Sequence, residues 1–277
     1  MNEVIGIRGG GDLATGVAWR LHQCGFKVYI MEIPKPMMVR RTVSFAQCLL
    51  DGAATVEGVT AVRIEQASLG EMQKVWAQGM IPVIVDPDAS SISVIKPLSV
   101  IDCTLAKQNL GMHRGMARIT IGIGPGFTAG QDVGYVVETM RGHFLGRVIT
   151  EGTAIPDTGI PESVNGFANE RVIRSLAAGT FLSERNIGQH IEAGEIMGSC
   201  GGVEIPAKIT GVIRGLIANG TEVPEHMKVA DIDPRDDARY INFISDKARA
   251  IGGGVLEALM RGLLEVENGR RDPGIIE

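Results

Sequence analysis

The chain is poor in the residues that build disulfide frameworks and metal sites. Only four of its 277 residues are cysteine, and Cys24, Cys48, Cys103 and Cys200 form no Cys-x-x-Cys pair. A disulfide scaffold and a zinc knuckle are therefore not expected, and this cysteine usage is typical of a reducing cytoplasm. No Walker A loop, His-Glu-x-x-His helix or Gly-x-Ser-x-Gly elbow occurs either. The sequence predicts no metal site.

Long apolar runs and basic blocks are also lacking. No stretch reaches the roughly 18 apolar residues that span a bilayer, and the first residues do not form a secretion signal. The net charge is −5, which argues against non-specific binding to nucleic acid. We therefore expect a cytoplasmic protein that contacts neither membrane nor nucleic acid.

Glycine is abundant, at 37 residues, whereas aromatic residues make up only 4%. In the first hundred residues, continuous apolar runs alternate with helical patterns, which is typical of a parallel sheet buried on both faces. The expected strands are 3–8, 27–31, 59–64, 81–85 and 98–101, and the expected helices are 12–24, 44–50 and 69–78. Ser68 and Glu71 form a capping box for the last of these helices.

After about residue 118 the strands become short, and an internal repeat begins near residue 170. Gly179 aligns with Gly211, and Phe181 aligns with Ile213. Two such copies predict two β-hairpin units that pack together, as in lipoyl-like barrel-sandwich hybrids. The turn between the copies has no lysine, so a carrier role is not expected.

The expected fold class is therefore α/β. A Rossmann-like parallel-sheet domain (1–115) is followed by a β-rich middle segment (116–169), a non-carrier barrel-sandwich-hybrid unit (170–240) and a C-terminal helix (241–277). Apolar residues form a stripe along one face of the expected helix in this last segment, and three consecutive glycines interrupt it. These glycines suggest close packing against another backbone or a ligand.

The first expected site is a triple glycine between a strand and a helix. Such a turn exposes backbone N–H groups to phosphate, and Glu32 follows about 20 residues later, where a ribose-binding carboxylate is expected. Asp12 adds a negative charge, which favours a phosphorylated ligand other than NAD. The predicted binding residues are Gly9, Gly10, Gly11, Asp12 and Glu32, with Arg40 and Arg41 as phosphate partners or as solvated surface arginines.

A second cluster follows the strand near residue 120. Gly124 and Gly126 flank a proline in a loop that could aim N–H groups at an anion. Glu138 and His143 are candidates for a catalytic acid–base pair, and Arg141 for binding a carboxylate or phosphate. The alternative for these residues is a hairpin with solvated charges.

Long motifs give the chain a resemblance to a known family. They include Ile7–Gly16, Val39–Val43, Val56–Val59, Glu138–His143 and Ile244–Arg249. In these motifs the chain resembles the YqeB-type accessory proteins, which serve the maturation of selenium-dependent molybdenum hydroxylases. The first domain is also similar to that of xanthine dehydrogenase accessory factors.

The resemblance implies a cytoplasmic accessory protein that binds a molybdopterin-type ligand or a nucleotide and serves a client molybdenum hydroxylase. The identity of the ligand, and whether the protein is an enzyme or forms a homo-oligomer, stay open. Two alternatives remain: an NAD(P)-dependent oxidoreductase that uses the same glycine-rich turn, and a non-catalytic scaffold.

Overall fold

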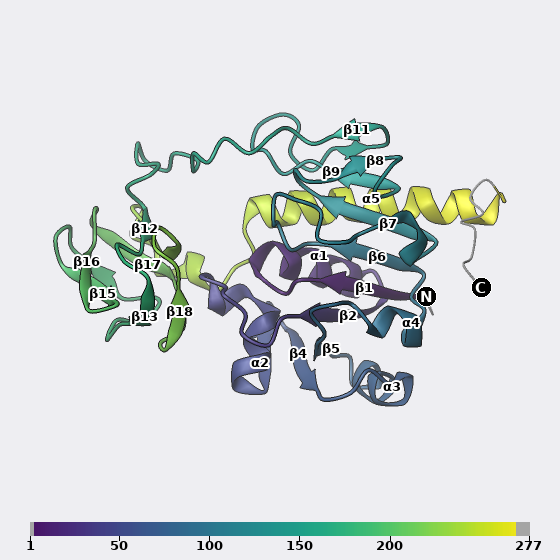
Figure 1. Cartoon of the computed structure of the whole chain (residues 1–277), viewed down its shortest axis with the longest axis horizontal. Coiled ribbons are helices and arrows are strands. Elements are labelled where there is room, and N and C mark those ends of the chain that lie inside the picture. The colour runs from purple at the N-terminus through teal and green to yellow at the C-terminus, as the bar shows by residue number, and fades with distance from the viewer. Residues whose placement is uncertain (1–2, 270–277) are drawn as a thin grey trace. The chain divides into compact units, whose positions relative to one another are not determined.

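The computed structural model describes residues 3–269. The chain divides into two compact units (Figure 1). Unit 1 comprises Met1–Pro34, Phe45–Asp157 and Ile244–Glu277, and unit 2 comprises Lys35–Ser44 and Thr158–Phe243. Residues 270–277 of the predicted C-terminal segment lie outside the described residues.

Within the described residues, unit 1 contains a nine-stranded sheet in the order β10-β9-β7-β6-β1-β2-β5-β4-β3. Neighbouring strands run parallel except at the two outer pairs, β3–β4 and β9–β10, which are antiparallel. The strands are β1 (Val4–Arg8), β2 (Lys27–Glu32), β3 (Ala53–Val56), β4 (Val59–Ile64), β5 (Ile81–Val85), β6 (Ser99–Asp102), β7 (Ile119–Ile123), β9 (Tyr135–Val137) and β10 (Val148–Ile149).

Helices pack against this sheet. They are α1 (Asp12–Gln23), α2 (Cys48–Asp51), α3 (Leu69–Ala77), α4 (Ser91–Ile95) and α5 (Asp246–Glu267). Strands β8 (Thr128–Ala129) and β11 (Gly152–Thr153) form a separate antiparallel pair. The predicted cap of α3 is confirmed, because the Glu71 N–H donates to Ser68 Oγ at 3.1 Å. Ser245 caps α5 in the same way.

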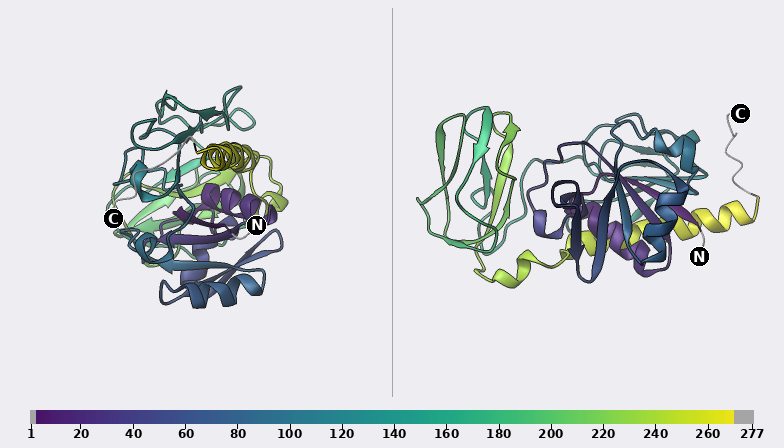
Figure 2. Two further views of the ribbon diagram at one scale, coloured as in Figure 1. Left: turned by 90° about the vertical axis from the view of Figure 1, so that its right-hand side faces the viewer. Right: turned by 90° about the horizontal axis from the view of Figure 1, so that it is seen from below.

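The glycines inside α5 allow it to approach other backbone segments. Helix α5 lies beside α1 (Figure 2). A Cβ on Gly252 would lie 2.9 Å from the Gly16 carbonyl oxygen, and a Cβ on Gly254 only 2.0 Å from the Gly146 carbonyl oxygen. Close packing against backbone therefore explains two of the three glycines; a Cβ on Gly253 would have no described atom within 4 Å.

Unit 2 contains two antiparallel sheets in its described part, β16-β15-β13-β18 and β12-β19-β17-β14. The strands are β12 (Val172–Arg174), β13 (Gly179–Leu182), β14 (His190–Ile191), β15 (Ile196–Cys200), β16 (Val203–Pro206), β17 (Gly211–Leu216), β18 (Thr221–Val223) and β19 (Lys228–Asp233). The first strand of each sequence copy, β13 or β17, pairs with the second strand of the other copy, β18 or β14. Side chains from both sheets share one core, including Phe181 and Ile213.

The predicted fold class, a Rossmann-like domain with a barrel-sandwich-hybrid unit and a C-terminal helix, is wrong. The sheet is mixed, and β5 lies between β2 and β4, so the strand order departs from the Rossmann order. The Glu57–Gly58 turn, with φ of +44° and +81°, forms a β3–β4 hairpin that makes this edge antiparallel. Strands β7, β9 and β10 extend the same sheet, and α5 packs within unit 1. The fold is mixed α/β with a large parallel and antiparallel sheet.

Candidate functional site

The order in which strands are added to the sheet reverses at β1. Strand β2 lies on one side of β1, and β6 lies on the other. In open α/β sheets, ligands bind outside the carboxyl ends of the strands where the order reverses. The segments that follow β1, β2, β6, β7 and β9 all leave the sheet at this carboxyl edge, because these strands are parallel.

The glycine turn after β1 is fixed by packing at its first two residues. Gly9 has φ of +90°, and a Cβ there would lie 3.2 Å from the Cys103 carbonyl group. A Cβ on Gly10 would lie 3.0 Å from the Ala46 side chain. Both glycines are buried. The backbone of this turn therefore requires glycine at positions 9 and 10 whether or not a ligand binds.

Gly11 differs from its two neighbours. It is the N-cap residue of α1 with φ of −67°, and as a glycine it has no side chain to cap this helix. A Cβ on Gly11 would have no described atom within 4 Å. Asp12 follows in the first turn, where its charge interacts favourably with the helix dipole. The space beside Gly11 is therefore the part of the turn that a ligand can reach.

Glu32 lies against the same turn. The Gly10 N–H donates to Glu32 Oε2 at 2.7 Å, and the Ile33 N–H donates to Oε1 at 2.7 Å. Burial raises the pKa of Glu32, and these two hydrogen bonds offset part of that rise. The structure thus brings Glu32 and Gly10 together, and the carboxylate accepts one of the N–H groups that the sequence assigned to a ligand.

A buried ion pair fixes the loop that follows β6. Arg8 Nη1 donates to Asp102 Oδ2 at 2.9 Å, and Arg8 Nη2 donates to the Leu110 carbonyl oxygen at 3.2 Å. Asp102 Oδ1 accepts hydrogen bonds from the N–H and the hydroxyl of Thr104. The guanidinium group of Arg8 therefore orders this loop. Lys107, in the same loop, pairs with Asp157 at 2.5 Å.

The second glycine turn, after β7, contacts that loop from the other side. Gly124 has φ of +75°, and a Cβ there would lie 2.7 Å from Thr139 Oγ1. Gly126 has φ of +114°, and a Cβ there would lie 2.7 Å from the Gln108 backbone nitrogen. Residues 103–108 consequently run between the two glycine turns that the sequence singled out.

Glu138 and His143 lie in different environments. The buried Glu138 carboxylate accepts hydrogen bonds from the N–H groups of Thr139, Met140 and Ile155 at 2.7, 2.7 and 2.8 Å. His143 is exposed, and no hydrogen bond joins it to Glu138 among residues 3–269. Arg141 forms a two-pronged ion pair with Asp246. The acid–base roles of Glu138 and His143 remain predictions. In the structure, the Glu138 carboxylate binds the backbone of two neighbouring segments.

Arg40 and Arg41 belong to unit 2. Arg40 Nη2 donates to the carbonyl oxygens of Tyr240 and Phe243 at 2.9 and 3.3 Å, and Arg41 Nε donates to the Leu216 carbonyl oxygen at 2.7 Å. The two guanidinium groups thus tie segments of unit 2 together. Their predicted meeting with the phosphate of a ligand at Gly9–Gly11 remains a prediction.

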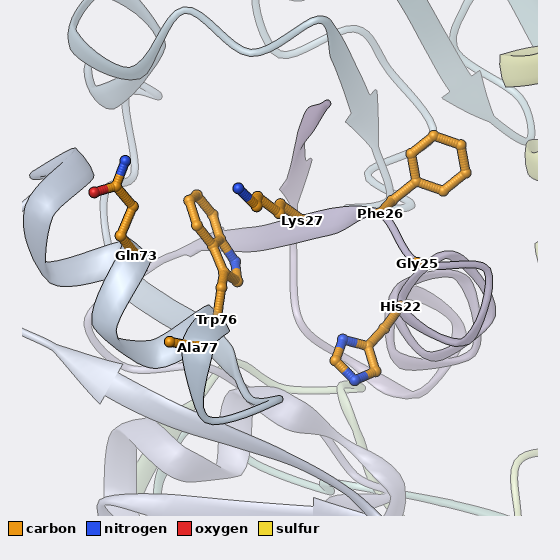
Figure 3. A pocket seen from close by; sticks show the side chains of 7 residues that line it. All are labelled: His22, Gly25, Phe26, Lys27, Gln73, Trp76 and Ala77. Carbon is orange, nitrogen blue, oxygen red and sulfur yellow. The ribbon is translucent and has the colours of Figure 1, made fainter. Parts of the chain in front are cut away.

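A hollow that the sequence did not indicate lies at the opposite, amino edge of the sheet (Figure 3). It has a volume of about 440 Å³ and is lined by His22, Lys27 and Trp76, among others. The Lys27 ammonium group lies 5.9 Å from the centre of the Trp76 ring, whose Nε1 donates to the Val28 carbonyl oxygen. Burial lowers the pKa of His22.

No group of three or more histidine, cysteine, aspartate or glutamate side chains among the described residues is placed to hold a metal ion. None of the described helices combines the length and the apolar character needed to cross a membrane.

The chain matches no family model. It is 49% identical over 259 residues to a protein of Escherichia coli (strain K12) described as "Uncharacterized protein YqeB"; the match covers 94% of this chain and 48% of that protein. The chain therefore spans about half the length of this relative. The resemblance to the YqeB type is confirmed to this extent, and the relative's description carries no function.

Similarity to solved structures is low. A succinylglutamatedesuccinylase/aspartoacylase from Rhodobacter sphaeroides gives a TM-score of 0.22 with 18% identity, covering 31% of this chain and 29% of that chain. An aspartoacylase family protein from Mesorhizobium loti gives 0.27 with 10% identity, covering 84% and 85%.

Proposed function

We propose that the protein binds a phosphorylated pterin or nucleotide at the carboxyl edge of the sheet in unit 1, beside Gly11. In this proposal it is an accessory protein that serves the maturation of selenium-dependent molybdenum hydroxylases. The family resemblance of its motifs supports the maturation role, and the geometry of the glycine turn supports the ligand class.

The observation that carries the proposal is the start of α1. Gly11 begins this helix next to β1, where the strand order reverses, and a Cβ there would meet nothing within 4 Å in the described chain. The first turn of a helix presents backbone N–H groups and the positive end of the dipole, which together favour an anion. A phosphate group fits this chemistry.

The negative charges beside the turn restrict the ligand further. Asp12 and Glu32 both flank Gly11, and Glu32 already accepts the Gly10 N–H. A carboxylate binds hydroxyl or amino groups well and repels a second phosphate. The ligand therefore presents one anionic group to α1 and a neutral, hydrogen-bonding edge to Glu32, as a ribose or a pterin ring does.

A matched pair of variants separates binding from folding. Gly11→Ala adds a Cβ in open space, and Gly11→Asp adds a carboxylate where the phosphate is proposed. Aspartate is also a favourable N-cap residue, so Gly11→Asp should fold at least as stably as the wild type. We expect thermal-shift titration with molybdopterin forms and cytidine nucleotides to stabilise the wild type most, Gly11→Ala less because its methyl group enters the space proposed for the ligand, and Gly11→Asp not at all.

The same titration includes NAD and NADP. Strong stabilisation by NAD(H) together with hydride transfer would replace the proposal with an oxidoreductase. If no phosphorylated compound stabilises the wild type, while Gly11→Asp still supports maturation of a client enzyme, a scaffold role replaces ligand binding.

A further inference from the structure

The hollow at the amino edge of the sheet forms where two helices end and one strand begins (Figure 3). Gln73, Trp76 and Ala77 are three and four residues apart, so their side chains lie on one side of α3 near its end. His22 belongs to the last turn of α1, and Lys27 is the first residue of β2. Three segments thus converge on a space of about 440 Å³, which is within the range of small-molecule sites.

A hydrogen bond fixes the indole ring of Trp76 in this hollow. The ladder between β2 and β5 begins only at Ile30, and Trp76 Nε1 donates to the Val28 carbonyl oxygen at 2.8 Å. Trp76 is half-buried, so part of its ring surface remains accessible. The buried side chain of Phe26 adds apolar surface to the lining. The hollow therefore offers a flat aromatic surface in a fixed orientation.

Three polar side chains of the hollow have no polar partner in the protein. Within residues 3–269, the side chains of His22, Lys27 and Gln73 form no hydrogen bond and no ion pair. The Lys27 ammonium group instead lies 5.9 Å from the centre of the Trp76 ring. Burial lowers the pKa of His22, so its imidazole is neutral at neutral pH. Lys27 therefore supplies the formal charge of the lining, and that charge is not neutralised by a carboxylate.

We infer that the hollow binds a small aromatic carboxylate, at a site separate from the one proposed beside Gly11. The ligand's ring packs against the Trp76 indole, and its carboxylate pairs with the Lys27 ammonium group. Gln73 and His22 can donate further hydrogen bonds to it. The ligand carries one negative charge only, because α1 and α3 both end here and the negative ends of their dipoles disfavour a second.

The test uses benzoate as the probe, with benzamide lacking its charge and cyclohexanecarboxylate lacking its aromatic ring. The chain has two tryptophans, so NMR of the full chain with isotope-labelled tryptophan gives two indole N–H signals, which Trp76→Phe assigns. We expect benzoate to shift the Trp76 signal saturably and to leave the signal of Trp19, which packs against Arg249, nearly unchanged. Benzamide should bind about tenfold more weakly, and cyclohexanecarboxylate about threefold.

Variants of Lys27 test the charge directly. Lys27→Met keeps the length of the side chain and removes its charge, so it should bind benzoate about tenfold more weakly than the wild type does. Lys27→Arg should retain benzoate binding. Gly11→Asp, at the opposite edge of the sheet, should match the wild type. Dispersed indole signals show that each variant is folded.

Three results would overturn the inference. If benzoate shifts both indole signals equally, or shifts neither, the hollow is not its site. If Lys27→Met binds benzoate as tightly as the wild type does, the ammonium group does not recognise the carboxylate. If Gly11→Asp loses benzoate binding, the probe binds at the carboxyl edge instead.

Discussion

Glu138 shows how one carboxylate can organise a turn at the edge of the sheet. It is buried, and it accepts hydrogen bonds from three backbone N–H groups, two in the segment that follows β9 and one at Ile155. These hydrogen bonds give Glu138 a structural role at its position in a long motif. The sequence indicated that Glu138 matters but not why, because burial depends on segments distant in the chain.

Replacing Glu138 tests this structural role. Glu138→Ala removes a buried carboxylate and leaves three backbone N–H groups, one of them on the buried Thr139, without their acceptor, so we expect a loss of about 3 kcal/mol in the free energy of unfolding. Urea denaturation measures this loss. Glu151→Ala, at an exposed position, should change stability by less than about 0.5 kcal/mol. A loss for Glu138→Ala no larger than this control would contradict the structural role.

Asp231 in unit 2 should make stability depend on pH. Burial alone would raise the pKa of Asp231, but Lys228, Arg214 and Arg171 together lower it below the ordinary value of 3.8. A lowered pKa stabilises the fold above the unfolded value, and this stability is lost as the pH falls through the folded value. At neutral pH, Asp231→Asn should cost about 3 kcal/mol, because it removes the buried carboxylate that pairs with both Arg171 and Arg214.

Acid titration of the two proteins by circular dichroism checks the sign. The wild type should lose stability more steeply than Asp231→Asn as the pH falls below about 4. Parallel curves for the two proteins would show that the carboxylate of Asp231 does not contribute to acid unfolding.

Among the elements, helix α5 offers a matched pair of glycines. A Cβ on Gly254 would lie 2.0 Å from the Gly146 carbonyl oxygen, whereas a Cβ on Gly253 would have no described neighbour within 4 Å. Gly254→Ala should therefore destabilise by about 3 kcal/mol through overpacking. Gly253→Ala should stabilise by up to about 1 kcal/mol through helix propensity. Thermal unfolding of both variants checks the order, and equal effects would contradict this packing of α5.

Elements with strong local signals were predicted well. The predicted strand 27–31 corresponds to β2 (Lys27–Glu32), and the predicted helix 12–24 corresponds to α1 (Asp12–Gln23). The predicted helix 44–50 is instead a 3₁₀ turn followed by α2 (Cys48–Asp51). There the N–H groups of Phe45 and Ala46 donate to Thr15 Oγ1 and the Gly10 carbonyl oxygen. Tertiary hydrogen bonds thus override a helical pattern that the sequence alone favoured.

For the whole molecule, the division into two units implies two separate cores. Phe181 is fully buried in the core of unit 2, so Phe181→Ala should cost about 4 kcal/mol. We expect hydrogen exchange to show lost protection in β13, β15 and β17, while β1, β6 and β7 stay protected. Uniform loss of protection across both sets of strands would contradict separate cores.

Sequence reasoning could not reveal how the chain returns to unit 1. Local patterns identified the repeat and the C-terminal helix, but not that α5 packs against α1, or that β5 inserts between β2 and β4. These arrangements depend on pairings between distant segments, which leave no local signal. Glu32 could be placed beside the glycine turn from its spacing in the sequence, because the two lie within one strand–helix–strand unit. The Arg8–Asp102 pair joins residues far apart in the chain, so only the structure revealed it.

The most direct test of the account is to identify what the purified protein carries. Native mass spectrometry of the wild type and of Gly11→Asp, followed by analysis of the released small molecules, compares the two under identical conditions. We expect a phosphorylated compound on the wild type that is absent from the equally stable Gly11→Asp protein. The same compound in equal amount on both proteins would contradict an anion site at the start of α1.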